Sequence, residues 1–485
     1  MLPNLLRIAA VRRLGIAGAG GLLLVGGALA ANGDVAADTA APSVPVADCG
    51  PGSMPETSIQ GRVPKADYDS GRAAQGYTCN TVQVGHHGST GGFKTLRYTD
   101  SQGHTCAFYD SSRMIGLDVA TNLLNGTGLG VVVLDMTDPA HPVKTANLVT
   151  PAMLQPHESL LVNQQRGLLA AVMGTLVTAP GILDVYDVKT DCRHPRLQSS
   201  TLSGVLGHES GFSPDGRTFW SVGSAGFTLT AVDLTDPRRP RTLLTKSGMV
   251  YHGVRLSPDG RTMYAADMGM PSSRTILDNP GLAILDVSEV QDRKPKPTVR
   301  VLSHMTWSGI SIPQVPQPFT RDGHRYLFEV DEFSDWFGDG YKIDFAHGSV
   351  GAARIINVDD PARPFLVSDV RLQVHEPKNR TPELLADPGA KNVIGGYAAH
   401  YCSVASEQDP SLAACSMNGS GLRVFDIRDV AHPREAAYFN KPAKGGANAL
   451  SQPAWDPQHD SVWYTDGTSG FFAVRLTNGV GDLLD

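Results

Sequence analysis

The sequence predicts an all-β fold, a seven-bladed β-propeller built from four-stranded antiparallel blades. Three observations support this prediction: a short strand pattern that recurs seven times, proline-containing turns that follow most copies, and Asp-Gly turns that precede them. A unit repeated along the whole chain is typical of propellers and solenoids. Solenoid repeats are shorter and lack Asp-Gly hairpins, so the propeller is favoured.

The recurring strand is rich in β-branched residues and ends in Asp or in a residue at the same place. Its copies are VVVLD at 131–135, LDVYD at 183–187, LTAVD at 229–233, LAILD at 282–286, RIIN at 354–357, LRVFD at 422–426 and FFAVR at 471–475. Six of the seven are followed by a turn with proline, as in DPAHP at 138–142. Because proline cannot donate to a β-ladder, these turns separate strands.

Hairpin turns lie upstream of the recurring strand. The clearest are SPDG at 213–216 and at 257–260, each between two strand-like runs, and Asp-Gly at such a place is a strong hairpin signal. Each repeat therefore reads as an inner strand, a second strand, the recurring third strand and an outer strand. The last repeat ends soon after its third strand, so we expect TVQV at 81–84 to supply its outer strand and close the ring.

The N-terminus resembles a targeting segment. Arg7, Arg12 and Arg13 precede a small-residue apolar run from 14 to about 31, which predicts a signal peptide over 1–31, with a retained membrane anchor as the alternative. We expect an N-terminal extension at 32–78, partly disordered, and the propeller at 79–485. The protein is then expected to be secreted or held in the cell envelope, without a membrane span after signal removal. A closed ring has no free sheet edge, which favours a monomer.

Charge and cysteine content narrow the environment and the partners. The net charge of -7 gives no attraction to phosphate backbones, so nucleic acid is not expected as a partner. Six cysteines in an exported chain are expected to form disulfides. Cys402 and Cys415 flank a turn between two strand-like runs, so we expect them to pair. Cys79 is expected to pair with Cys106, which leaves Cys49 and Cys192 for each other, although six cysteines allow 15 pairings.

Four histidines fall at one position of the repeat, near the start of the inner strand. They are His157, His208, His252 and His400, whereas the other blades offer Lys94 or its neighbour, Ser308 and Ser451. Equivalent positions on inner strands lie at one height around the propeller axis, so the four imidazoles are expected to approach one another.

A cluster of imidazoles suits copper, zinc, iron or nickel, with Glu158 and Glu209 as candidate oxygen ligands. Two other interpretations remain open. In one, the histidines line a polar ligand-binding mouth; in the other, each histidine fixes the turn of its own blade. The sequence does not identify a catalytic residue.

Two insertions are expected on the face of the propeller that carries the histidines. One joins the second and third strands of the fifth repeat, and the other precedes the inner strand of the sixth. Their candidate ligand-binding residues are Glu329, Asp331, Glu332, Asp335, His347, His375 and Glu376. The alternative is that these loops are only solvated acidic segments.

The third strands and their Asp-Pro-x-x-Pro turns resemble the LVIVD-repeat family of exported bacterial propellers, from about Cys79 onward. The resemblance implies the architecture but no particular chemistry. More distantly, the units in which a histidine precedes Ser-Pro-Asp-Gly, at His208 and His252, are similar to the selenium-binding and methanethiol-oxidase propellers. That likeness implies a metal held by channel histidines and rests on a few blades only.

Two main functions follow from these observations. The first is a binding or scaffold protein that engages a protein, a glycan or a small molecule at the histidine-lined channel mouth. The second is a metal-dependent oxidoreductase in which the channel histidines hold copper, iron or zinc. A polysaccharide lyase or hydrolase is a weaker third reading, because the sequence shows no firm pair of catalytic carboxylates.

Overall fold

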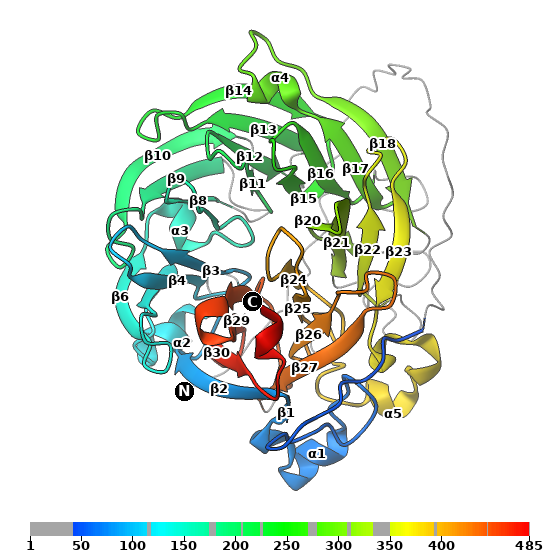
Figure 1. Cartoon of the computed structure of the whole chain (residues 1–485). Helices are drawn as coiled ribbons and strands as arrows, with labels where there is room; N and C mark the ends of the chain where they lie inside the picture. Colours follow the sequence, from blue (N-terminus) through cyan, green and yellow to red (C-terminus); the bar gives the residue numbers. More distant parts are fainter. Residues whose placement is uncertain are drawn as a thin grey trace, which may run out of the picture. The chain divides into compact units, whose positions relative to one another are not determined.

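The structure, a computed structural model, describes residues 42–113, 118–173, 181–204, 207–223, 227–269, 279–307, 312–332, 350–391, 395–443 and 445–484. Within these ranges the chain forms seven antiparallel sheets, which surround a central axis as blades (Figure 1). The predicted seven-bladed β-propeller is confirmed. The predictions for residues 1–31, and for Ser308, Asp335 and His347, concern residues outside the described ranges.

Each blade has four strands in the predicted order. The inner strands are β3 (Thr95–Thr99), β7 (Leu161–Asn163), β11 (Gly211–Phe212), β15 (Tyr251–Leu256), β19 (Ile312–Pro313), β24 (Tyr401–Val404) and β28 (Ala454–Asp456). The second strands are β4 (Thr105–Asp110), β8 (Leu168–Val172), β12 (Thr218–Gly223), β16 (Thr262–Asp267), β21 (His324–Glu332), β25 (Leu412–Ser416) and β29 (Ser461–Asp466).

The recurring sequence pattern forms the third strand of every blade. These strands are β5 (Val131–Asp135), β9 (Gly181–Asp187), β13 (Thr228–Asp233), β17 (Gly281–Asp286), β22 (Ala353–Asn357), β26 (Leu422–Asp426) and β30 (Gly470–Leu476). The outer strands of blades 1 to 6 are β6 (Val143–Leu148), β10 (Arg196–Gly204), β14 (Arg241–Ser247), β18 (Arg300–Thr306), β23 (Phe365–Val370) and β27 (Arg434–Asn440).

The ring closes as the sequence predicted. Strand β2 (Thr81–His87) pairs antiparallel with β30, so an N-terminal segment supplies the outer strand of blade 7. Two further strands extend the regular blades. Strand β1 (Tyr77–Cys79) adds to the outer edge of blade 6, and β20 (Gln317–Arg321) forms a hairpin with β21 in blade 5.

Apolar clusters lie between neighbouring blades all the way around the ring. Seven such clusters join blades 1 and 2, 2 and 3, 3 and 4, 4 and 5, 5 and 6, 6 and 7, and 7 and 1. The last, for example, packs Val132 of β5 against Phe471 of β30. Burial of each such side chain contributes roughly 1.5–3 kcal/mol. The core is therefore distributed between the blades.

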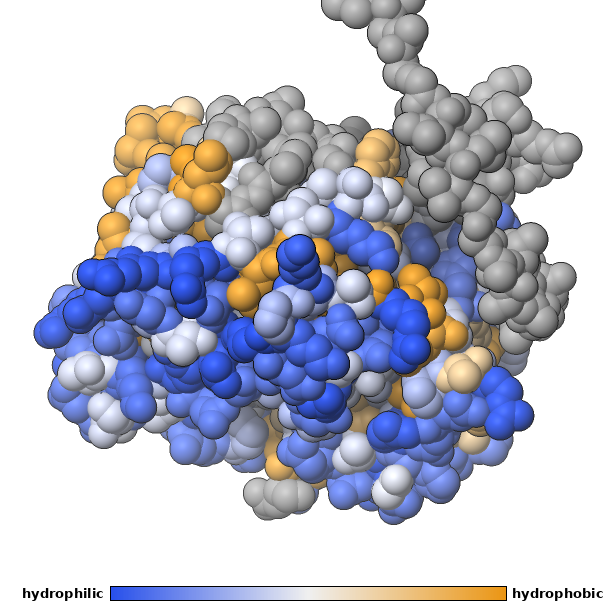
Figure 2. Space-filling view, turned by 90° about the horizontal axis from the view of Figure 1, so that it is seen from above, coloured by the Kyte–Doolittle hydropathy of each residue, from blue (hydrophilic) through white to orange (hydrophobic). Residues whose placement is uncertain are grey.

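Short helices occur in the connections and in the N-terminal extension. They are α1 (Lys65–Ser70), α2 (Val119–Leu124), α3 (Pro151–Leu154), α4 (Ser288–Gln291) and α5 (Pro382–Leu385), with 3-10 turns at Ala73–Gln75, Gln373–His375, Pro377–Asn379, Pro457–His459 and Gly481–Leu484. None of the helices in the described part of the chain is long and apolar enough to cross a bilayer. The side of the molecule shown in Figure 2 is mostly hydrophilic, with smaller apolar areas.

Residues 42–79 pack onto blade 6. The buried Arg423 of β26 donates to Glu435 of β27 at 3.0 Å and also bonds Glu56 of the extension. Val63 donates its backbone N–H to the hydroxyl of Tyr397 at 3.2 Å. A buried cation with two carboxylate partners is costly to leave half-paired. This part of the extension is therefore fixed to the propeller by charge as well as by its strand.

Three disulfides are present. Cys402 pairs with Cys415 across the β24–β25 hairpin, as expected. The expected Cys79–Cys106 and Cys49–Cys192 pairs are wrong, because Cys79 pairs with Cys49 and Cys106 pairs with Cys192. The reason is that Cys79 lies in β1 on blade 6, whereas Cys106 lies in β4 of blade 1. Three disulfides indicate an oxidising compartment.

Candidate metal centre

The four predicted histidines meet on the propeller axis. His157 and His208 lie in the connections that lead into β7 and β11, His252 is the second residue of β15, and His400 directly precedes β24. The ring centroids of His157 and His208 are 4.8 Å apart, and those of His208 and His252 are 4.6 Å apart. The repeat position identified in the sequence thus places three of the imidazoles, from three blades, next to one another.

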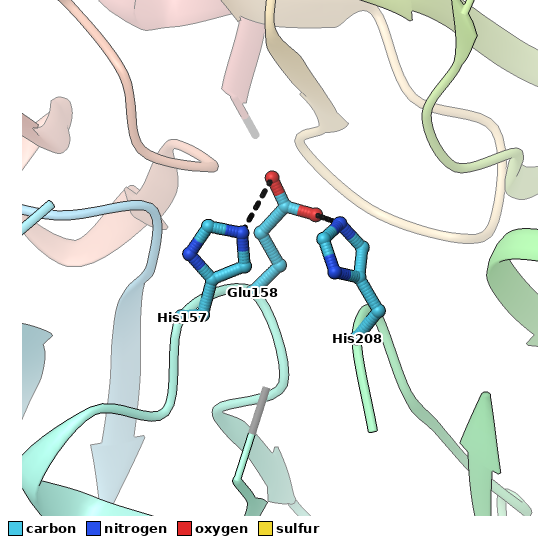
Figure 3. Close-up of side chains that lie close together, drawn as sticks. All are labelled: His157, Glu158 and His208. Atoms are coloured by element: carbon cyan, nitrogen blue, oxygen red, sulfur yellow. Dashed lines mark ion pairs between the residues drawn. The ribbon is translucent and has the colours of Figure 1, made fainter. Parts of the chain in front are cut away.

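The carboxylate of Glu158 lies among these rings. Its Oε2 is 3.0 Å from Nε2 of His208 and 3.2 Å from Nε2 of His252. Its Oε1 is 3.2 Å from Nε2 of His400 and 4.0 Å from Nε2 of His157. Figure 3 shows the carboxylate between His157 and His208, with one oxygen directed to each side. A single glutamate therefore contacts all four histidines.

A second carboxylate approaches from blade 5. Glu332, the last residue of β21, places Oε1 at 3.3 Å from Nε2 of His252 and Oε2 at 2.8 Å from Nε2 of His400. The side-chain amide of Gln314 donates to Oε1 of Glu158 at 3.0 Å and to Oε2 of Glu332 at 3.2 Å. The amide thus holds the two carboxylates side by side.

Backbone carbonyls orient two of the rings. Nδ1 of His252 lies 2.9 Å from the carbonyl oxygen of Pro313, and Nδ1 of His400 lies 2.6 Å from that of Leu450. A carbonyl can only accept, so each Nδ1 carries the hydrogen and donates it. This leaves Nε2 of both rings directed at the carboxylates. The same outer contact fixes the tautomer of most metal-binding histidines.

The cluster is largely shielded from water. The side chains of Glu158, His252 and His400 are at most 2% exposed, whereas those of His157 and His208 are 15% and 16% exposed. The open side of the cluster is therefore at His157 and His208.

Burial disfavours the charged form of each of these side chains, and the charges and hydrogen bonds around a side chain determine the direction in which its pKa shifts. Burial would lower the pKa of His252, but Glu332 and Glu158 outweigh it and raise the pKa to about 9. Burial is likewise outweighed at His400, where hydrogen bonds to Glu158 and Glu332 raise the pKa to about 9. Burial would raise the pKa of Glu158, yet the charges of His208 and His252 hold it well below the ordinary value.

His157 differs from the other three histidines. Burial lowers its pKa to about 3, and Glu158 offsets only part of that effect. Its backbone is left-handed, with φ of 51°, an uncommon conformation for a residue other than glycine. Its ring packs against Phe93 at a centroid distance of 4.5 Å. His157 is therefore a neutral imidazole at physiological pH.

A buried ionic layer lies on the far side of the cluster along the axis. Glu209 contacts Nζ of Lys94 at 2.6 Å, Nη1 of Arg255 at 2.8 Å and the hydroxyl of Tyr401 at 2.7 Å. The side chains of Lys94 and Glu209 are fully buried. The predicted ligand Glu209 is thus engaged by this layer, and the structure does not bring its carboxylate into the histidine cluster.

The opposite ends of the inner strands open on a cavity of about 650 Å³. Arg255 and Gln452 line this cavity, and both also reach the ionic layer, because Gln452 accepts from Nζ of Lys94 at 3.0 Å. The ionic layer therefore separates the cavity from the histidine cluster.

No family model and no curated protein matches this chain. Among solved structures it is similar to hydrazine synthase from Kuenenia stuttgartiensis, with 12% identity and a TM-score of 0.51 over 81% of this chain and 97% of that chain. It is also similar to the periplasmic gluconolactonase of Pseudomonas aeruginosa, with 14% identity and a TM-score of 0.46 over 72% of this chain and 95% of that chain. At such identities the likeness concerns the fold alone.

The predicted residues of the two insertions lie at different places. Glu332 enters the cluster, but Asp331 instead pairs with the buried Arg354. Glu329 is fully buried, and its carboxyl oxygens make no hydrogen bond within the described residues. Burial, together with the nearby charge of Asp331, raises the pKa of Glu329 well above the ordinary value. Among these three acidic residues, Glu332 alone contacts the histidines.

The two predicted residues of the sixth-repeat insertion lie away from the cluster. Nε2 of His375 is 2.9 Å from the carbonyl oxygen of Tyr397, and its Nδ1 accepts from the N–H of Leu372. Glu376 accepts from the backbone of Ser43 in the extension and pairs with Lys378. His375 therefore holds the insertion together, and Glu376 fixes it to the extension.

Gln314 is the site residue that sequence reasoning missed. His208 and His252 each precede the glycine of their Asp-Gly turn, Gly216 and Gly260, by eight residues. Gln314 precedes Gly323 of the blade 5 turn by nine, so the same count would have reached its immediate neighbour. The extra hairpin strand β20 hides this relationship, and the expectation had fallen on Ser308 instead.

The donor set determines what the cluster can do chemically. Imidazole nitrogens combined with carboxylate oxygens suit zinc, copper, iron, nickel and manganese. The residues that can supply ligands are His157, His208, His252, His400, Glu158 and Glu332, and overlapping subsets of them place ligand atoms within 4.8 Å of one another.

Proposed function

We propose that this protein is a metal-binding β-propeller whose axial cluster of histidines and glutamates coordinates a first-row transition metal. One observation carries the proposal. Nε2 atoms of His208, His252 and His400, from three different blades, all lie within 3.3 Å of oxygens of Glu158 or Glu332. Four histidines and two glutamates, from five blades, converge on one part of the axis, as metal coordination requires.

A purely structural role explains the cluster less well. A histidine that only fixes its own turn would bond within its own blade, but His252 and His400 donate to carbonyls of the next blade, at Pro313 and Leu450. Burying charged groups without need also costs stability, since several kcal/mol of desolvation per ion is typical. An apolar axis would be simpler to build. The retained charges are better explained by a bound cation.

Of the two functions expected from the sequence, the metal-dependent one is thus favoured over a scaffold. Copper or iron in this nitrogen and oxygen environment would supply one-electron chemistry, so the reaction class that we propose is oxidation or reduction of a small substrate. The substrate would reach the metal from the side of His157 and His208, which are the more exposed ligands.

Metal analysis tests this proposal directly. Protein purified from an oxidising compartment, and metal-free protein refilled with copper, iron, manganese or zinc, should retain stoichiometric metal after desalting. His252→Ala combined with His400→Ala should abolish retention, whereas His432→Ala, at an exposed histidine that pairs with Asp429, should not. Correctly folded wild-type protein that retains none of these metals would overturn the proposal.

We also propose that the chain is exported and is related to the LVIVD-repeat propellers. The seven third strands with their proline turns support the relationship, and three disulfides support an oxidising destination. Expression of the full chain in a bacterial host, followed by N-terminal sequencing of the periplasmic fraction, should find a new terminus near residue 31. An intact N-terminus on protein confined to the cytoplasm would contradict export.

A further inference from the structure

The contacts of the metal centre divide into two matching halves. In the first half, Oε2 of Glu158 and Oε1 of Glu332 both contact Nε2 of His252, and Oε2 of Glu158 also contacts Nε2 of His208. In the second half, Oε1 of Glu158 and Oε2 of Glu332 both contact Nε2 of His400, and Nε2 of His157 lies 4.0 Å from Oε1 of Glu158. Each carboxylate gives one oxygen to each half.

The distances within each half are those between neighbouring ligands of one ion. Two donor atoms that each lie about 2.1 Å from a metal, at angles between a right angle and the tetrahedral angle, are about 3.0–3.4 Å apart. The observed separations are 3.0, 3.2 and 3.3 Å in the first half. They are 3.2 and 2.8 Å for His400 in the second half. Nε2 of His157 lies 4.0 Å from Oε1 of Glu158, close to the separation of about 4.2 Å that two ligands on opposite sides of one ion would have. Both halves therefore fit the dimensions of a coordination sphere.

We propose that the centre holds two metal ions, bridged by the carboxylates of Glu158 and Glu332. This inference rests on the proposed function and makes it more specific. His208 and His252 bind one ion, and His157 and His400 bind the other. Each ion then has two imidazoles and one oxygen from each carboxylate. Two ions that share such bridges lie about 3.5–4 Å apart.

A single ion would leave part of the arrangement without a role. It would use one oxygen of each carboxylate. With that ion in the first half, Oε1 of Glu158 and Oε2 of Glu332 would keep Gln314 and His400 as their partners, and the second pair of histidines would hold no ion. The amide nitrogen of Gln314 lies 3.0 Å from Oε1 of Glu158, 3.2 Å from Oε2 of Glu332 and 3.3 Å from Nε2 of His400, so it contacts three ligand atoms of the second half. It thereby holds the two carboxylates in the relative position that a double bridge needs.

Charge indicates which further ligand the pair would take. Two divalent ions bring four positive charges, of which Glu158 and Glu332 neutralise two. In the ionic layer next to the cluster, Glu209 already pairs with Lys94 and Arg255, so its carboxylate does not neutralise the ions. The ions would therefore take an anionic ligand, such as hydroxide or the oxyanion of a substrate, from the side where His157 and His208 are exposed.

Titration of the metal-free chain with Mn²⁺ tests the pair. We expect two ions per chain by elemental analysis, and an electron paramagnetic resonance spectrum in which the signal of isolated Mn²⁺ gives way to that of an exchange-coupled pair. Crystals of the loaded protein should show two anomalous peaks about 3.5–4 Å apart. One ion per chain with an uncoupled spectrum and a single peak would overturn the pair and leave the proposed function intact.

A bridging variant separates the two ideas further. Glu332→Gln keeps the size of the side chain but removes the charge that bridges both halves, so it should abolish the coupled signal and lower the stoichiometry to one ion or less. Glu383→Gln, at a side chain that is 82% exposed, should behave as wild type. A coupled pair that survives in Glu332→Gln would contradict the assigned bridge. No retained metal in any of the proteins would overturn the proposed function itself.

Discussion

A Cβ atom built on Gly253 would lie 2.3 Å from the carbonyl oxygen of Gln314. The same atom would lie 2.6 Å from Cγ of Glu209, which crosses Gly253 to reach Lys94 and Arg255. Gly253 directly follows His252, and the backbone of Gln314 directly follows the carbonyl that orients His252. The glycine therefore lets the inner strands of blades 4 and 5 come close enough to build the centre.

Gly253→Ala should disturb both stability and metal binding. Backbone and a buried side chain both occupy the space of the new methyl group, and such overpacking costs typically about 1–3 kcal/mol or more. We expect the free energy of unfolding to fall by that amount in chemical denaturation, together with a loss of metal retention. Gly445→Ala is the matched control, because a Cβ there meets nothing within 4 Å. Equal stability of the two variants would contradict the close approach.

The architecture was predictable because it is repeated. The seven third strands, the Asp-Gly turns and the proline turns all indicate the same four-stranded unit. Misreading one copy therefore does not change the predicted fold. The histidine column was predictable for the same reason, since His208 and His252 stand at one distance from their turns. Features that occur only once in the chain were not predictable in this way. Gln314 lies in blade 5, whose extra hairpin strand makes it irregular. Glu332 is one of several acidic residues in its segment. The partners of Cys79 and Cys106 depend on the blades in which these cysteines lie.

Metal-free protein should lose stability as the pH rises from 7 to 8. The pKa values of His252 and His400 are raised to about 9, above the ordinary 6.5. Their contribution is thus fully present below about 6.5 and is lost as the pH rises through about 9. Each group contributes on the order of 1 kcal/mol per pH unit within that window.

Chemical denaturation of the metal-free protein between pH 7 and 8 measures this slope. His157 opposes this slope only weakly, because it is neutral in the folded chain and mostly neutral in the unfolded chain over this range. In His252→Gln the slope should be about half that of the wild type. A flat profile in wild type would show that the two rings are not held protonated. Metal affinity should rise over the same interval, because metal must displace these protons.

Gln314→Leu should weaken metal binding without breaking the ring. The variant keeps a side chain of similar size but removes the donor shared by Glu158 and Glu332. Loss of such an outer contact typically lowers metal affinity by about 10–100-fold. Competition with a chelator measures the change, and Gln408→Leu, at an exposed position outside the cluster, is the control. Wild-type affinity in Gln314→Leu would mean that the carboxylates need no such support.

The three disulfides should stabilise the chain in the order of the loops they close. The sequence separations are 86 for Cys106–Cys192, 30 for Cys49–Cys79 and 13 for Cys402–Cys415. Loop-closure entropy predicts about 5, 4 and 3 kcal/mol respectively. Replacing each pair by serine and measuring the free energy of unfolding tests the order. A loss that is largest for Cys402–Cys415 would show that local packing outweighs the chain entropy.

Removing Glu209 should cost more than removing its partner Lys94. Glu209→Leu leaves both Lys94 and Arg255 beside the axis without a counter-charge, and breaking a buried pair in this way costs about 3–5 kcal/mol. Lys94→Met is milder, because Glu209 keeps Arg255 and the hydroxyl of Tyr401. The double variant should recover part of the loss, since it removes the more deeply buried of the two stranded cations. Denaturation of the four proteins gives the coupling energy, and additive losses would show that Lys94 and Glu209 do not interact.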